Sequence, residues 1–141
     1  MIPEAVANPA PEEIKRLLET ARSVAVVGLS PKPERDSYQV AKYLLEHGYR
    51  VIPVNPVVEE VLGQKSYPDL ESLPGPVDVV DVFRRSEFVP PIAEQAVALG
   101  AKALWLQLGV RHDQAAALAR DKGLLVVQDL CIKVMHHKLL G

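Results

Sequence analysis

The chain has 141 residues, of which 48% are hydrophobic and 24% are charged, the size and balance of one globular domain with a buried core. Its formal charge of -2 provides no overall field that would draw it to nucleic acid or an anionic membrane. No apolar run reaches the ~20 residues that span a bilayer, and the N-terminus does not resemble a signal peptide, so we expect a cytoplasmic protein.

Residues 1–10 are rich in proline and alanine, and this composition predicts a loose lead-in to the domain. The pattern changes at Pro11, where Ile14, Leu17 and Leu18 begin to recur at helical spacing. A proline in the first turn and acidic residues directly after it are typical of a helix N-terminus. We therefore predict a short helix before the first strand.

The stretch from residue 23 to residue 47 predicts a strand, a loop and a helix. Val24 to Val27 form an apolar, largely β-branched run without alternation, as in a strand buried on both faces of a parallel sheet. The run stops at Gly28, a polar loop follows, and Ser37 is a candidate N-cap for a helix that ends near His47. Such a turn directs backbone N–H groups and the positive end of a helix dipole into the loop, which favours phosphate.

The rest of the chain continues the alternation of strands and helices. Strands are predicted over 49–54, 78–83, 103–107 and 124–128, helices over 86–99, 115–122 and 132–140, and an irregular connection over 57–76. Five apolar strands alternating with helices indicate βαβ units and right-handed crossovers, hence one three-layer α/β domain over residues 1–141. We predict a Rossmann-like parallel sheet of order 3-2-1-4-5, with a flavodoxin-like order as the alternative.

In an open parallel sheet, the ligand site lies outside the carboxyl ends of the strands. Lys32, Arg35, Arg84 and Arg85 all follow predicted strands, so a slightly acidic protein would carry several cations on one rim. This arrangement suits an anion with several phosphates, and Phe83 could offer its ring to a base.

Each of these residues also has a purely structural interpretation. Gly28 can be an ordinary tight turn, the two arginines can be solvated or paired with carboxylates, and Gln107 can satisfy a backbone group. Three histidines, His112, His136 and His137, are expected at the surface or at helix caps. No Ser, Cys or carboxylate stands at a spacing that would pair with them for catalysis, and no catalytic or metal site is predicted.

The loop lacks the fingerprints of the common nucleotide-binding motifs. It reads Gly28-Leu-Ser-Pro-Lys-Pro, with prolines where a G-x-G-x-x-G dinucleotide loop has glycines, and no P-loop motif is present. An NAD site also needs an acidic residue after the second strand, where this chain has Asn55-Pro56. The sequence therefore favours a phosphate-bearing nucleotide that is held without that acid.

Five segments carry a resemblance to a known family: 24–33, 51–56, 78–84, 104–110 and 129–132. Together they resemble the CoA-binding domain family of small bacterial proteins, which are similar to the N-terminal domain of the succinyl-CoA synthetase α subunit. The resemblance implies a bound coenzyme A with its phosphates on the first loop. It implies phosphate contacts from Gly28, Ser30, Pro31, Lys32 and one of Ser37 or Tyr38, adenosine contacts from Asn55, Pro56, Phe83 and Arg84, and a place for Gln107 beside the pantetheine arm.

The chain departs from the synthetase at the catalytic step. The phosphorylated histidine of the synthetase lies in a second domain, and this sequence ends at Gly141, so His136 and His137 do not inherit its role. Cys131 resembles a cysteine near the ligase phosphate site but has no assigned chemistry. The prediction is a protein that binds CoA or acyl-CoA without turnover; an NAD(P)- or acyl-CoA-dependent enzyme and a ligase-associated subunit are the alternatives.

Overall fold

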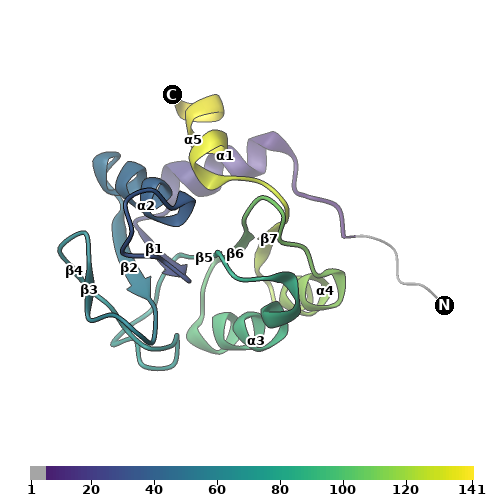
Figure 1. The fold of residues 1–141 in the computed structure, drawn as a ribbon. Coiled ribbons are helices and arrows are strands. Elements are labelled where there is room, and N and C mark those ends of the chain that lie inside the picture. Colours follow the sequence, from purple (N-terminus) through teal and green to yellow (C-terminus); the bar gives the residue numbers. More distant parts are fainter. Residues whose placement is uncertain (1–5) are drawn as a thin grey trace.

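The computed structural model describes residues 6–141 and consists of three layers, with helices on both faces of a central parallel sheet (Figure 1). The helices are α1 (Pro11–Thr20), α2 (Asp36–Glu46), α3 (Val89–Leu99), α4 (Asp113–Asp121) and α5 (Ile132–Leu140), and a 3-10 turn spans Ser86–Phe88. The strands are β1 (Ser23–Val27), β2 (Arg50–Val54), β3 (Glu60–Val61), β4 (Gln64–Lys65), β5 (Val79–Val82), β6 (Ala103–Leu106) and β7 (Leu125–Val127). Within residues 6–141, no helix is both long and apolar enough to cross a membrane.

The predicted fold class is confirmed, and the order of the sheet follows the Rossmann-like pattern with one strand reduced. The main sheet runs β2-β1-β5-β6-β7, with every neighbouring pair parallel. Beyond β2, Tyr67 forms a single parallel bridge with Val54, which occupies the third-strand position of a 3-2-1-4-5 order. The segment that we expected as the third strand, β5, instead lies on the other side of β1 and takes the fourth position.

Each strand of the main sheet divides its side chains between two apolar layers. In β1, Ala25 and Val27 face a core completed by α3 and α4, whereas Val24 and Val26 face a second core completed by α1, α2 and α5. All five residues of β1 are buried, which explains why its sequence shows no alternation of apolar and polar residues. Helices on both faces thus leave the strand ends as the place where ligands can approach the sheet.

Two local predictions need correction. Residues 1–5 lie outside the described part of the chain, but Val6 and Asn8 are not loose, because they hydrogen-bond to Asp113 and to the backbone of Gln128. Helix α2 begins at Asp36 with Arg35 as its N-cap residue, and no side chain caps it. Ser37 is therefore not the N-cap; its hydroxyl oxygen instead accepts a hydrogen bond from the N–H of Ser30, 3.0 Å away.

The turn after β1 requires glycine for two separate reasons. Gly28 has a φ of 85°, in the left-handed region that residues with a Cβ rarely adopt. A Cβ at this position would also lie 2.7 Å from the carbonyl oxygen of Phe83, at the end of the neighbouring β5. The missing side chain therefore lets the loop after β1 lie directly against the loop after β5.

One acidic side chain is buried in the centre of the sheet. Asp81 in β5 is 0% exposed, and neither of its carboxyl oxygens has a hydrogen-bond partner among residues 6–141. It pairs in register with Val26 and Trp105, so its surroundings in the sheet are apolar. Burial raises the pKa of Asp81 well above its ordinary value of 3.8, which favours the neutral form of this carboxyl group in the folded protein.

We expect Gly28→Ala to destabilise the protein by more than Gly48→Ala does. Gly48 has a similar φ of 89°, but a Cβ there would meet nothing within 4 Å. Both variants incur the left-handed strain of about 1–2 kcal/mol, and only Gly28→Ala adds the clash with the Phe83 carbonyl. Urea unfolding of the two variants measures the difference; equal losses of stability would show that the close approach at Gly28 does not constrain the fold.

The Asp81→Asn variant tests the neutral buried acid. Between pH 3.8 and the raised pKa of the folded state, the unfolded chain loses the proton of this carboxyl group more readily than the folded chain, so the stability of the parent falls as pH rises through that range. The free energy of unfolding of the Asn variant, relative to that of the parent, should therefore increase with pH by up to about 1.4 kcal/mol per pH unit. Urea unfolding at pH 5 and pH 7 measures this, with the exposed Asp121→Asn as the matched control. A difference between Asn variant and parent that does not change with pH would contradict the prediction.

Candidate functional site

Three adjoining cavities lie at the carboxyl edge of the sheet, around the ends of β1, β5 and β6. The loop cavity, of about 590 Å³, is lined by Gly28, Ser30, Lys32, Glu34, Arg35, Asp36, Ser37 and Phe83. The central cavity, of about 600 Å³, is lined by Asp36, Gln39, Val40, Phe83, Arg84, Arg85, Gln107, Leu108, Gly109, Val110, Cys131, Lys133 and Val134. The side cavity, of about 220 Å³, is lined by Val27, Gly28, Val54, Pro56, Pro68, Asp69, Leu70, Arg84, Phe88, Pro91, Ile92 and Gln95. Shared residues join the three into one site.

Hydrogen bonds to the hydroxyl groups of Ser30 and Ser37 fix the conformation of the loop after β1. The Ser37 hydroxyl accepts from the N–H of Ser30, and the Ser30 hydroxyl in turn accepts from the N–H of Lys32 at 3.1 Å. The N–H groups of Asp36, Ser37 and Tyr38, in the first turn of α2, have no acceptor among the described residues. This turn therefore presents unpaired donors and the positive end of the α2 dipole to the loop cavity, an arrangement that binds anions.

The cationic side chains at this edge of the sheet differ in whether they already form ion pairs within the protein. Arg85 lies 3.4 Å from Glu87, and both side chains are exposed, so this ion pair is weak. Lys32, Arg35 and Arg84 form no ion pair within residues 6–141, which leaves their charges available to a ligand. The Cδ of Arg84 lies over Gly28, and its guanidinium group stacks on Phe88, 4.6 Å from the ring centroid.

Phe83 and Arg84 stand at the junction of the cavities. The half-buried Phe83 lines both the loop cavity and the central cavity, and Arg84 lines both the central cavity and the side cavity. Their position follows from β5, which lies beside β1 and ends directly next to Gly28. One ligand could therefore contact the first loop, this ring and this guanidinium group at once.

Gln107 fixes one wall of the central cavity and offers a hydrogen-bond donor to it. Its side chain is buried, and its Oε1 accepts from the N–H of Ile132 at 3.0 Å, at the start of α5. Its Nε2 has no partner in the described chain, while the residue lines the cavity. The structural role that the sequence suggested is thus present, and the amide nitrogen remains free for a ligand.

Most of the predicted site residues lie together. Gly28, Ser30, Lys32, Ser37, Phe83, Arg84 and Gln107 line the loop cavity or the central cavity. Pro31 and Tyr38 line none of the three cavities, and Tyr38 packs against the apolar core under α2. Pro56 lines the side cavity, whereas Asn55 braces the loops: its Nδ2 donates to the Leu29 carbonyl, and its Oδ1 accepts from the N–H of Val57.

From the sequence alone we did not identify the residues that helices α2 and α5 contribute to the wall of the central cavity. Asp36 and Val40 from α2, and Lys133 and Val134 from α5, line the central cavity, as does Leu108 after β6. A usable signal existed, because in a βαβ fold the N-terminal ends of the helices meet at the same edge as the carboxyl ends of the strands. The first turns of α2 and α5 could therefore have been named as wall segments.

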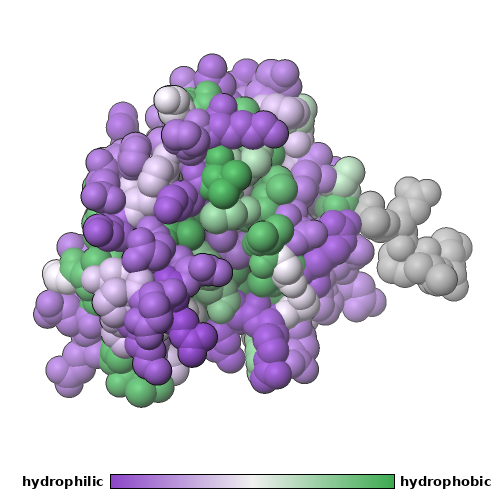
Figure 2. All heavy atoms as spheres, turned by 45° about the horizontal axis from the view of Figure 1, so that its top comes forward, coloured by the Kyte–Doolittle hydropathy of each residue, from purple (hydrophilic) through white to green (hydrophobic). Residues whose placement is uncertain are grey.

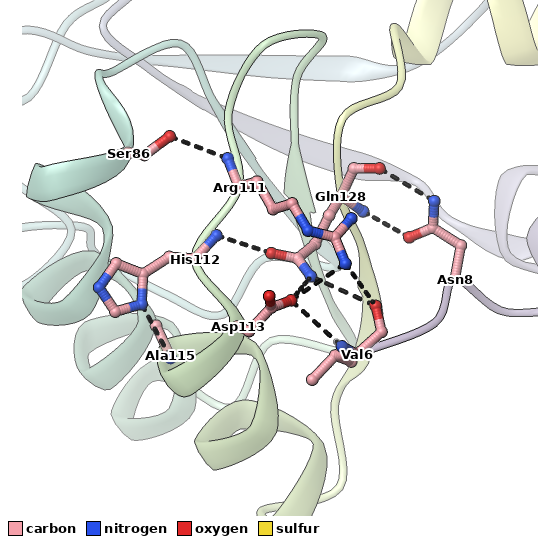
Figure 3. Close-up of polar contacts among 8 residues, drawn as sticks. All are labelled: Val6, Asn8, Ser86, Arg111, His112, Asp113, Ala115 and Gln128. Carbon is pink, nitrogen blue, oxygen red and sulfur yellow. Dashed lines mark hydrogen bonds and ion pairs between the residues drawn. The ribbon is translucent and has the colours of Figure 1, made fainter. Parts of the chain in front are cut away.

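A partly buried polar network holds residues 111–113, directly after the part of this loop that lines the central cavity (Figure 3). Gln128, at the end of β7, accepts from the N–H of His112 and donates to Asp113. Asn8 pairs with the N–H and the carbonyl of Gln128, while Arg111 contacts Asp113. The N-terminal segment thus stabilises one side of the site from behind.

Three histidines have structural positions. The sequence predicts all three at the surface or at helix caps, and this is correct for His112 and His137. The His112 Nδ1 accepts from the N–H of Ala115 and caps α4, and His137 is exposed on α5. His136 is buried, and its Nδ1 lies 2.8 Å from the Tyr43 hydroxyl, so it ties α5 to α2. Burial, His47 and His137 lower the pKa of His136. Within residues 6–141, no three His, Cys, Asp or Glu side chains are grouped so that they could hold a metal ion.

Comparison with known proteins identifies a family and several similar proteins. Residues 22–137 match the model of a family described as "CoA binding domain". The protein YneT of Bacillus subtilis is 44% identical over 129 residues, which cover 92% of this chain and 96% of YneT. A solved structure of a hypothetical protein from Pyrococcus horikoshii superimposes with a TM-score of 0.92 at 41% identity, covering 100% of this chain and 99% of that one.

Larger ligase subunits contain a similar segment. The α subunit of ADP-forming acetate–CoA ligase II from Pyrococcus furiosus is 29% identical over 126 residues. The match covers 82% of this chain but 28% of that subunit. By the family match, which spans most of its length, this chain belongs to the CoA-binding domain family.

Proposed function

We propose that this protein binds coenzyme A or an acyl-CoA through the loop after β1 and does not itself turn the ligand over. The observation that carries the proposal is the loop cavity, where unpaired N–H groups at the start of α2 lie beside Lys32 and Arg35. These donors and cations suit the diphosphate of CoA. Glu34 and Asp36 also line this cavity, so the cations must offset two nearby carboxylates.

The side cavity suits the adenosine end of the ligand. Its walls are mainly apolar, with Pro68, Leu70 and Ile92 among them, and Gln95 offers both a donor and an acceptor. Phe88 and the Arg84 guanidinium group lie at its edge. A purine ring can stack on such planar groups while its polar edge meets the amide.

The central cavity suits the pantetheine arm. It adjoins the loop cavity at Phe83 and continues past Gln107, whose free amide nitrogen could donate to an amide carbonyl of the arm. A hydrogen bond contributes about 0.5–1.5 kcal/mol, so a ligand that supplies an acceptor to this amide nitrogen gains affinity at this position.

Two features argue against an NAD-binding or catalytic role. Both polar atoms of the Asn55 side chain are engaged by Leu29 and Val57, so the residue does not offer the free carboxylate that an NAD ribose requires. In the central cavity, Cys131 is the one thiol, and no histidine lines that cavity. A thiol without a neighbouring base is a weak nucleophile, which favours binding over turnover.

We expect free CoA to raise the Tm of the purified protein, because a ligand that binds only the folded state stabilises it by about 2.7 kcal/mol at 100 times its Kd. Lys32→Ala and Arg84→Ala should each weaken CoA binding by about tenfold or more, since each removes a charge-assisted contact. The loss should shrink between 50 mM and 500 mM salt through screening. Isothermal titration calorimetry measures both effects.

Two exposed cations outside the cavities provide matched controls. Lys138→Ala and Arg16→Ala remove the same charges from α5 and α1, and CoA affinity should stay within about twofold of the parent. NADH serves as the competing ligand and should not displace CoA. Absence of any Tm shift at saturating CoA would refute the proposal, and equal losses in the rim and control variants would refute the assigned contacts.

A further inference from the structure

Two apolar side chains lie at the open mouth of the central cavity, beside exposed polar residues that include Arg84 and Arg85. Leu108, after β6, is 71% exposed, and Val134, on α5, is 58% exposed, yet both line the cavity. They are two of the five large apolar side chains that are exposed among residues 6–141. Figure 2 shows apolar side chains gathered around a hollow on this face, with polar surface around them. A cluster of this kind beside a cavity marks a binding site for apolar groups.

The chemistry of the walls changes in one direction across the sheet edge. Free cations and N–H donors surround the loop after β1, the lone amide donor of Gln107 follows at the end of β6, and the apolar lip of Leu108 and Val134 comes last. Val40 and Val110 add buried apolar surface at the base of the same cavity. An acyl-CoA has the same order of groups, namely diphosphate, amide-bearing arm, thioester and acyl chain.

We propose that the preferred ligand is an acyl-CoA with an uncharged apolar chain of several carbons, and that the lip formed by Leu108 and Val134 covers this acyl chain. The inference rests on the proposed CoA binding and adds the class of acyl group. Covering the chain would remove apolar surface of both side chains from water, which free CoA cannot do.

The neighbouring charges do not call for a carboxylate on the acyl chain. Lys133 lies with its Nζ 5.7 Å from the centroid of the Tyr43 ring on α2, and Arg85 is paired with Glu87. Each of these two cations has a contact within the protein, although the exposed Arg85–Glu87 pair is weak, and the lip formed by Leu108 and Val134 itself carries no charge. A neutral chain is the complement of the remaining surface.

Calorimetric titration of the full chain with free, acetyl-, butanoyl-, hexanoyl- and succinyl-CoA tests the inference. Affinity should rise from acetyl- to hexanoyl-CoA by up to about fourfold for each methylene that is covered. Butanoyl-CoA should bind more tightly than succinyl-CoA, whose acyl group also has four carbons but ends in a carboxylate in place of the methyl group.

The variants Leu108→Ser and Val134→Ser test whether the acyl chain of the ligand lies against these two side chains. In each, the ratio of hexanoyl-CoA affinity to free CoA affinity should fall at least threefold below that of the parent. Leu118→Ser, at a 41% exposed leucine on α4 outside the three cavities, is the matched control and should keep the parent's ratio.

The outcomes separate this inference from the proposed function. If CoA binds and the acyl forms bind no better, or succinyl-CoA binds best, the acyl class is wrong and CoA binding stands. A preference for hexanoyl-CoA that survives both lip variants would place the chain elsewhere and overturn the inference. If neither CoA nor any acyl-CoA binds, the proposed function fails, and the inference fails with it.

Discussion

The close approach of Gly28 to the carbonyl of Phe83 is the contact on which the rest of the site depends. It brings the loops after β1 and β5 together, although 55 residues separate them in the chain. Because of it, the first turn of α2, the Phe83 ring and the Arg84 guanidinium group border connected cavities. A side chain at position 28 would both strain the backbone and separate these loops.

Polar side chains at the strand ends stabilise this geometry before any ligand arrives. Asn55, Gln107 and Gln128 each follow a strand of the main sheet, and each bonds to the backbone of another segment. One of these bonds is buried and two are partly buried; they hold the loops in place, and a preorganised site loses less entropy on binding. Asp81 shows the opposite case, since its buried carboxyl group has no hydrogen-bond partner among residues 6–141, and its raised pKa lowers stability as pH rises above 3.8.

The net charge of the protein says little about its candidate site. A chain with a charge of -2 nevertheless presents Lys32, Arg35 and Arg84 at one edge of its sheet, without ion-pair partners in the part of the chain that the structure describes. The parallel arrangement explains this, because it places the ends of all the main strands on one side of the molecule. Local field and helix dipole, rather than global charge, would attract an anionic ligand.

The sequence by itself determined the alternation of strands and helices, the turn at Gly28 and the edge of the sheet at which the candidate site lies. These follow from local signals: unbroken β-branched runs, helical periodicity and a glycine where φ must be positive. Only the tertiary structure decided that Ser37 closes the loop, that Pro31 and Tyr38 line none of the three cavities, that β5 lies beside β1, and that Val134 joins Leu108 at the cavity mouth. The physical reason is that side-chain direction and strand pairing depend on contacts between segments far apart in the chain, and composition and periodicity carry no information about them.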